Sequence, residues 1–293
     1  MISLNILREE SIKSAFYRLF DSLTSYAKES LTNIERFDYS IHEARKSFKR
    51  LRSLTRIYRH AIDDEVFAEL NTLFRDAGRQ LSHFRDIDAI SECLHKIEFK
   101  NGEKSEIIES LKIQVDSIRY NNDEEEISKA INNVIADIDA SAEIVKSINL
   151  PEDMKPFIKK GIKKIYDNGR TLYYKNLIDE SDILMHELRK KVKQLWDVAL
   201  IFNNGSKEEV EYAEEIHALS IYLGDYHDLV LTFEFVYEEK LILEEESLAK
   251  FKKILFKRKE KIAKRAFNQA SQIFEKAPDI FAKDFLHKFV SKR

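Results

Sequence analysis

The fold is decided by the stretch IHEARKSFKRL at residues 41–51. A similar stretch, MHELRKKVKQL, occupies residues 185–195, and seven positions keep identity or close chemistry. Each stretch is followed at nearly the same distance by a second motif, LSHFRD at residues 81–86 and LGDYHD at residues 223–228. Two motifs in the same order and at similar spacing indicate an internal duplication.

The composition predicts an all-α protein. Only six glycines and three prolines occur among 293 residues, whereas sheet proteins use both residue types at their turns. The glycine-rich phosphate loops of common nucleotide-binding folds are missing from the sequence. A single cysteine, Cys93, excludes an internal disulfide and favours a reducing compartment, so we expect a cytoplasmic protein. No signal peptide and no apolar run long enough to span a membrane is recognisable.

Hydrophobic periodicity and breaker residues predict helices over almost the whole chain. Asp63 and Asp182 are the expected N-caps, and the boundary between the halves is expected near Pro151 and Pro156. We therefore expect one domain, residues 1–293, built from the halves 1–149 and 150–293. Each half would be a bundle of about four helices, and a pseudo-two-fold axis would relate the two. The expected helical segments are 4–32, 38–61, 63–98, 103–120, 124–148, 152–178, 182–203, 207–240, 244–276 and 279–291.

The helix that carries the first motif has one cationic face. On a helical wheel, six basic residues fall within an arc of roughly 100°, and two more widen that stripe on one side. The opposite face is expected to enter the core. The stripe comprises His42, Arg45, Lys49, Arg52, Arg56 and Arg59, widened by Lys46 and Arg50; the core face comprises Ala44, Phe48, Leu51, Thr55, Tyr58 and Ile62.

The second copy repeats a shorter stripe, with Trp196 where the first copy has Arg52. Its basic members are His186, Arg189, Lys190 and Lys193, and its core face is Leu188, Val192, Leu195 and Ala199. Further stripes run along Arg75, Arg79, Ser82 and Asp86, along Arg258, Lys261 and Arg265, and along Lys159, Lys163, Tyr166 and Arg170. A lone stripe of this kind is commonly a solvated face bridged to acids, but the repetition favours a binding surface for a polyanion.

The paired His-x-x-Arg helices, each followed by a Leu-x-x-x-(Arg/His)-Asp motif that we expect to form a turn, resemble the CHAD domain, the conserved histidine α-helical domain. The resemblance covers nearly the whole chain. It implies two pseudo-symmetric four-helix bundles whose basic residues face a central groove or pore. It also implies binding of inorganic polyphosphate without catalysis, and with neither cofactor nor metal. The Glu-x-Glu-x-Lys signature of an attached triphosphate-tunnel domain is missing from the sequence.

The predicted site combines this resemblance with the stripes. Arginine offers paired donors to phosphate oxygens, and lysine offers a mobile point charge. Asp86 and Asp228 are expected to orient the basic residues of the repeated segment. The predicted polyphosphate ligands are His42, Arg45, Lys46, Lys49, Arg50, Arg52, Arg56, Arg75, Arg79, Arg85, Arg170, His186, Arg189, Lys190, Lys193, His227, Arg258, Lys261 and Arg265.

Three other functions remain open at the level of sequence. Basic stripes also suit nucleic acid, and polyanion sites cross-react, although the plentiful aromatic residues fall mostly on apolar faces. The pair His227-Asp228, with His186 or His217 upstream, has the residue types of metal-dependent phosphohydrolases of the HD type. A basic groove could also receive an acidic partner protein.

Overall fold

The computed structural model describes residues 3–33, 37–101, 106–119, 124–238 and 241–290. Within these ranges the chain forms eleven α-helices and no strand, which confirms the all-α prediction. None of the described helices has the length and apolar character of a membrane span. The helices are α1 (Ile12–Thr32), α2 (Phe37–Ile57), α3 (Asp64–Gln80), α4 (His83–Asn101), α5 (Glu106–Arg119), α6 (Glu124–Lys146), α7 (Lys155–Ile178), α8 (Asp182–Ile201), α9 (Lys207–Tyr237), α10 (Glu245–Ile273) and α11 (Pro278–Phe285), with the short helical turns η1 (Arg59–Ala61) and η2 (Leu286–Val290).

Capping side chains explain where several helices begin. The Asp63 carboxylate accepts from the backbone N–H groups of Glu65 and Val66, which confirms it as the N-cap of α3. The expected N-cap of α8 was wrong by one position, because the Ser181 hydroxyl accepts from Leu184 N and Asp182 is the first helical residue. A serine hydroxyl satisfies an orphan N–H as well as a carboxylate does.

Two of the expected helices differ clearly from those in the structure. Residues 4–11, expected to be helical, form an irregular segment before α1. The Ser11 hydroxyl caps the first turn of α1. The single helix expected over residues 63–98 is two helices, α3 and α4, which meet at Leu81 and Ser82. The corresponding segment at residues 223–228 lies inside the uninterrupted helix α9. The repeated motif therefore marks a turn only in the first half of the chain.

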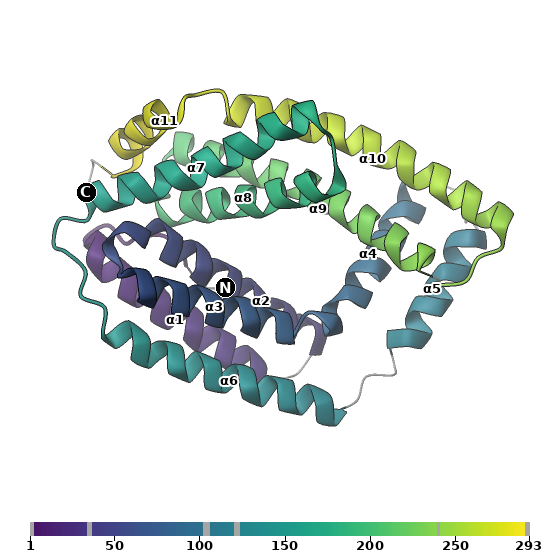
Figure 1. Cartoon of the computed structure of the whole chain (residues 1–293), viewed down its shortest axis with the longest axis horizontal. Coiled ribbons are helices and arrows are strands. Elements are labelled where there is room, and N and C mark those ends of the chain that lie inside the picture. The colour runs from purple at the N-terminus through teal and green to yellow at the C-terminus, as the bar shows by residue number, and fades with distance from the viewer. Residues whose placement is uncertain (1–2, 34–36, 102–105, 120–123, 239–240, 291–293) are drawn as a thin grey trace.

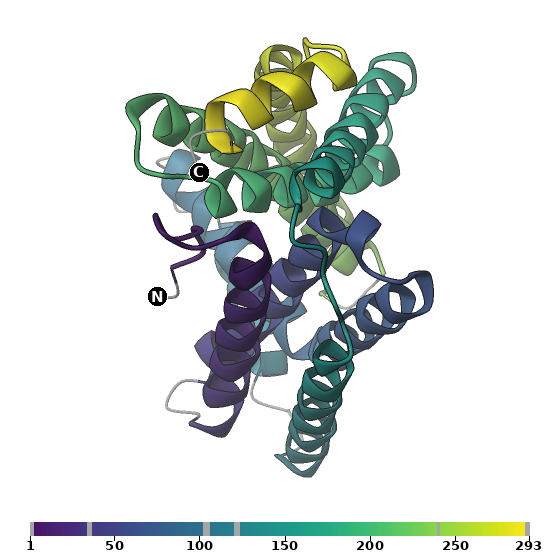
Figure 2. The same cartoon turned by 90° about the vertical axis from the view of Figure 1, so that its left-hand side faces the viewer.

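Two groups of helices pack against each other (Figures 1 and 2). Helices α1, α2, α3 and α6 contact one another in one group, and α7, α8, α9, α10 and α11 form the other. A continuous apolar core joins the groups, since it contains Phe16, Phe48 and Phe74 from the first and Tyr166, Val192 and Phe274 from the second. Helix α2 contacts both α7 and α8 across this junction. The duplication itself stays a prediction.

Helices α4 and α5 leave the first group. They pack against each other, and α4 packs on α9, beside the far end of α10 (Figure 1). A second apolar core forms there from Leu94, Leu111, Leu229 and Phe251. The Gln114 side chain fastens α5 to the loop before α10, because it donates to Ile242 O at 2.9 Å and accepts from Ile242 N at 2.6 Å. Part of the first half thus depends on helices of the second half for its core.

Candidate functional site

The two motif helices bury the faces that the helical wheel predicted. On α2, Ala44, Phe48, Leu51 and Thr55 are each at most 1% exposed, as is Tyr58 directly after the helix. On α8, the same holds for Leu188, Val192, Leu195 and Ala199. Burial of these apolar faces fixes the rotation of each helix about its axis, so the basic side chains leave the core together.

Basic side chains of α2 and α8 come together where these helices pack. We call this group the cationic cluster. The charge of Lys46 lowers the pKa of Lys193, and the charge of Lys49 lowers the pKa values of His186 and His227. The charges of Arg52 and Arg56 lower the pKa of Lys191 in the same way. The cationic cluster consists of Lys46, Lys49, Arg52 and Arg56 of α2, His186, Arg189, Lys190, Lys191 and Lys193 of α8, and His227 of α9.

A histidine pair lies at one end of the cationic cluster. The Nδ1 atoms of His186 and His227 are 3.2 Å apart and their ring centroids are 4.2 Å apart. Burial, followed by the charges of Arg189, His186, Lys49 and Lys190, lowers the pKa of His227 to about 3. Burial and the charge of Lys190 also lower the pKa of His186. The short Nδ1–Nδ1 distance fits a neutral pair in which one ring donates to the other.

The surroundings of the basic residues of α8 disfavour their charged forms. Burial is the largest cause that lowers the pKa values of Arg189, Lys191 and Lys193. Neighbouring cations add to the effect, namely Arg56 for Lys191 and Arg189 for Lys193. The Nε atom of Arg189 is buried and has no hydrogen-bond acceptor among the described residues. Carboxylates oppose these shifts only in part, namely Asp228 for Arg189, Glu187 for Lys191 and Asp197 for Lys193, so the loss of water prevails.

Two arginines of α2 share one neutral acceptor. Arg56 donates to Asn71 Oδ1 at 2.5 Å and to Arg52 O at 2.7 Å, while Arg52 Nε donates to Asn71 Oδ1 at 3.2 Å. Burial and the charge of Arg52 lower the pKa of Arg56 to about 10. Asn71 orients both guanidinium groups and neutralises neither. Asn71 could not be predicted from the sequence, because an isolated asparagine forms no recognisable pattern.

Two acids, Asp76 and Asp197, lie beside basic residues near the cationic cluster. Asp76 accepts from Arg75 Nε at 2.8 Å and lies 3.6 Å from Arg79, so it neutralises the stripe of α3 in part. Asp197 is buried, and its Oδ1 atom lies 4.0 Å from Arg50 Nε. Burial raises the pKa of Asp197, although Ser53, Arg50 and Lys193 oppose the shift. Neither Asp76 nor Asp197 was among the predicted site residues.

The repeated glutamate of the motif makes the same local contact in both copies. Lys46 Nζ lies 3.1 Å from Glu43 Oε1, and Lys190 forms an ion pair with Glu187, each three residues along the helix. Glu43 is buried and also accepts from Tyr26 Oη at 3.1 Å. Burial opposes the ionised form of Glu43, but the hydrogen bond and the charge of Lys46 prevail and lower its pKa. The spacing shared by Glu43 and Glu187 was the signal that could have revealed this pair.

Asp228, one of the two predicted orienting acids, interacts with the cationic cluster through its charge. Burial raises the pKa of Asp228, and the charge of Arg189 opposes that shift. The interaction fits the expected orientation of Arg189, which stays a prediction because no described hydrogen bond joins the two. The side chains of Asp86 and Arg85 lie outside the described part of the structure.

Several predicted ligands make contacts elsewhere. Arg170 donates to Phe274 O at 3.1 Å and covers the ring of Tyr174. Arg258 donates to Ile97 O at 2.8 Å and so fastens α10 to α4. Lys261 and Arg265 are exposed on α10. Tyr166, which shared a stripe with Lys159, is buried and stacks on Phe281 with ring centroids 3.7 Å apart. The tertiary packing therefore gives the α7 and α10 stripes different neighbours from those of α2 and α8.

The comparison with protein families agrees with this geometry. A sequence profile of the CHAD domain matches residues 18–236, about three quarters of the chain. The chain belongs to the CHAD domain family. The matched segment contains both motif helices of the CHAD domain and the helix that carries His227, and it ends before α10 and α11. No similar sequence was found among curated proteins.

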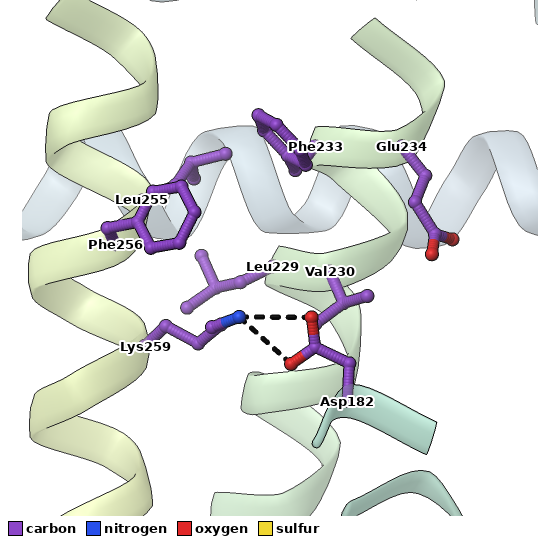
Figure 3. Close-up of a pocket in the computed structure, with 8 residues that line it drawn as sticks. All are labelled: Asp182, Leu229, Val230, Phe233, Glu234, Leu255, Phe256 and Lys259. Atoms are coloured by element: carbon purple, nitrogen blue, oxygen red, sulfur yellow. Dashed lines mark hydrogen bonds and ion pairs between the residues drawn. The ribbon is translucent and has the colours of Figure 1, made fainter. Parts of the chain in front are cut away.

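A small pocket of this CHAD protein lies away from the cationic cluster, between α9 and α10 (Figure 3). Its volume is about 160 Å³, and its walls include Leu229, Phe233 and Phe256. Lys259 reaches Asp182 at 2.9 and 3.0 Å, and Tyr226 donates to the same carboxylate at 2.6 Å. Because Lys259 is paired with Asp182, and because the rest of the lining is apolar apart from Glu234, this pocket does not resemble a polyanion site.

Proposed function

We propose that the chain binds inorganic polyphosphate, a long polyanion, in the cationic cluster, and that it does so without catalysis. One observation carries the proposal: where α2 contacts α8, basic side chains of the two helices lie close enough to act on one another's charge. Burial and neighbouring cations lower the pKa values of Arg52, Arg56, Lys191 and Lys193 in the chain without ligand. A bound anion would supply the missing negative charge and restore these groups to favourable surroundings.

The shape of the cationic cluster favours an extended ligand. Lys49 and Arg56 are seven residues apart on α2, which corresponds to about 10 Å along the helix. A flexible chain of phosphates can contact cations along that whole distance, whereas a single phosphate reaches only a few of them. The guanidinium groups of Arg52 and Arg56, already oriented by Asn71, would lose little further freedom when they bind.

The environment of the histidine pair supports binding rather than metal-dependent hydrolysis. A divalent ion at His186 and His227 would meet the positive charges of Lys49, Arg189 and Lys190, which already act on these rings. Within the described residues, no group of three or more histidine, cysteine, aspartate or glutamate side chains is placed to hold a metal ion. A polyanion would find the same surroundings attractive.

A titration with phosphates of graded length tests the proposal. Long-chain polyphosphate should bind far more tightly than orthophosphate or ATP. For about six phosphate contacts, the affinity should fall near 10³-fold between about 50 and 200 mM salt, by analogy with nucleic acid. A flat salt response, or equal affinity for ATP, would rule out the proposed ligand. Competition with single-stranded DNA separates polyphosphate binding from nucleic-acid binding, since stronger binding of the DNA would overturn the proposal.

A further inference from the structure

The first half of α7 presents four exposed lysines, which we call the α7 lysine surface. Its members are Lys155, Lys159, Lys160 and Lys164. None of them forms an ion pair with a described residue, whereas their neighbour Lys163 reaches Asp279 at 2.6 Å. The surface therefore displays a run of positive charge that the folded chain leaves open to solvent.

This arrangement costs helix stability. Lys155 and Lys159, like Lys160 and Lys164, are four residues apart, and like charges at that spacing destabilise a helix by about 0.2–0.5 kcal/mol per pair. Cations in the first turns of a helix also oppose its macrodipole, whose positive end lies there. A bound polyanion would remove both costs, so the α7 lysine surface has the electrostatics of a binding site.

Basic residues extend the surface on both sides of α7. Burial, followed by the charges of Arg59 and Lys160, lowers the pKa of His60 in η1, which places these groups close together. On the other side, Lys159, Lys283 and His287 line a hollow of about 430 Å³ between α7 and the C-terminal helices.

Three of the nearby acids are already engaged by other cations, while Asp153 accepts from the backbone N–H of Lys155 at 3.2 Å. Asp64 pairs with Arg59. Asp284, which also lines the hollow, pairs with Lys276 at 2.5 Å. Asp279 pairs with Lys163. The positive excess therefore rests with Lys159, Lys160 and their exposed neighbours rather than being cancelled across the surface.

The end of α2 joins this surface to the cationic cluster. Gly161 packs so tightly on α2 that a Cβ at this position would overlap the carbonyl oxygen of Ile57. Ile57 follows Arg56, a member of the cationic cluster, and η1 follows directly and contacts α7. From Lys49 to Ile57, the last residue of α2, the helix advances about 12 Å. An extended ligand in the cationic cluster could therefore continue past Arg56 onto α7.

We propose that the α7 lysine surface is a second contact region for the same polyphosphate chain, which runs from the cationic cluster past the end of α2 and onto α7. This inference rests on the proposed function and deepens it. It assigns to the protein a preference for chains long enough to occupy both regions. A short phosphate chain fills one region at a time and gains nothing from their proximity.

The decisive variant removes three charges from the surface: Lys159→Gln, Lys160→Gln and Lys164→Gln together. The matched control removes three exposed lysines from α10, Lys253→Gln, Lys257→Gln and Lys264→Gln. Affinities for tripolyphosphate and for long-chain polyphosphate are measured over a range of salt concentrations. The single tryptophan, Trp196, stacks on His217 at 4.2 Å, and Lys193 of the cationic cluster acts on that histidine. The fluorescence of Trp196 therefore reports ligand binding at the cationic cluster independently of binding at the α7 lysine surface.

The α7 triple variant should lose about tenfold in affinity for long-chain polyphosphate, and its salt slope should fall by about 3, one for each lysine. Tripolyphosphate binding followed by Trp196 should match the wild type, and the α10 control should match the wild type throughout. Thermal unfolding should be unchanged or shifted upward, because like charges are removed from an exposed face. The single variant Lys160→Gln should give a smaller loss of the same kind.

A long-chain affinity and salt slope equal to those of the α10 control would overturn the inference while leaving the proposed function intact. Loss of single-stranded DNA binding with no loss of polyphosphate binding would also overturn it, because the surface would then serve nucleic acid. Failure of the wild type to bind either phosphate chain would instead contradict the proposed function itself.

Discussion

Helices α2 and α8 carry the same His-Glu-x-Arg-Lys sequence and meet different surroundings. On α2, His42 keeps 43% of its side chain exposed, with Glu43 at 3.9 Å, and Lys49 is exposed. On α8, His186 meets His227, and Lys193, the counterpart of Lys49, has its pKa lowered chiefly by burial. At the matched positions, the repeated motif thus supplies an accessible half on α2 and a partly buried half on α8, although Arg52 and Arg56 of α2 are partly buried as well. The accessible cations can move to meet a ligand, while the buried ones set the potential that attracts it.

The comparison predicts that the α2 half contributes most to binding. Arg45→Gln with Lys49→Gln should weaken long-chain polyphosphate binding by about 100-fold or more, since each charge-assisted hydrogen bond is worth about 1.5–3 kcal/mol. Arg189→Gln with Lys193→Gln should cost clearly less, because these groups are already partly desolvated. Titration of both variants against the wild type, with circular dichroism as a check of folding, measures the difference.

Lys49→Gln alone serves as the control for folding, because Lys49 is exposed whereas part of Arg45 is buried. Equal losses from the two double variants would show that accessibility does not decide which half of the cationic cluster binds more strongly.

The position of α2 depends on backbone contact with α7, and this can be tested without touching a charge. Gly161→Ala places a Cβ against the Ile57 carbonyl, so the free energy of unfolding should fall by about 2 kcal/mol through overpacking. Chemical denaturation measures the loss. If the variant were as stable as the wild type, the close approach of α2 and α7 would not be a constraint on the cationic cluster.

The histidine pair predicts a pH dependence of stability that comes from the buried half. The unfolded chain protonates His227 near its ordinary pKa of about 6.5, whereas folding lowers that pKa to about 3. The unfolded state therefore binds more protons below that ordinary pKa, and folding stability falls as the pH falls. From this group alone, the loss should be about 1 kcal/mol between about pH 7.5 and pH 5.5, after allowance for partial exposure.

His227→Gln should flatten this part of the profile, as followed by denaturation at both pH values. The exposed His95, far along α4, provides the matched control as His95→Gln. A steeper profile after His227→Gln would mean that the histidine gains rather than loses proton affinity on folding.

The smallest expected effect concerns the helix on which the buried half rests. Arg189 lies over Gly224 of α9, and a Cβ there would sit 3.8 Å from Arg189 Nε, an ordinary contact. Gly224→Ala should raise the free energy of unfolding by about 0.5 kcal/mol, because alanine favours the helix interior. Polyphosphate affinity should change less than twofold. Destabilisation would indicate that Arg189 needs the space left by the glycine.

Much of the local structure could be predicted because amphipathic periodicity is a local property. The buried faces of α2 and α8 and the cap at Asp63 follow from side chains within a few turns of one another. The break at Leu81 and Ser82 could not be predicted in this way. No glycine or proline marks it, and the equivalent positions in α9 remain helical. Helix continuity there is decided by packing rather than by propensity.

For the candidate site, too, some properties follow from local sequence and others depend on tertiary packing. By itself, the sequence determined that the chain is helical, that two helices carry matching basic faces, and that it resembles the CHAD domain. Only the tertiary structure decided which cations meet. Lys191 lies about 140° from His186 on the wheel, outside the predicted stripe, yet it faces Arg52 and Arg56. Arg258 lies in a predicted stripe, yet it bonds to the end of α4. A wheel specifies the direction of a side chain relative to its own helix, whereas its partners and its pKa depend on which helix covers that direction.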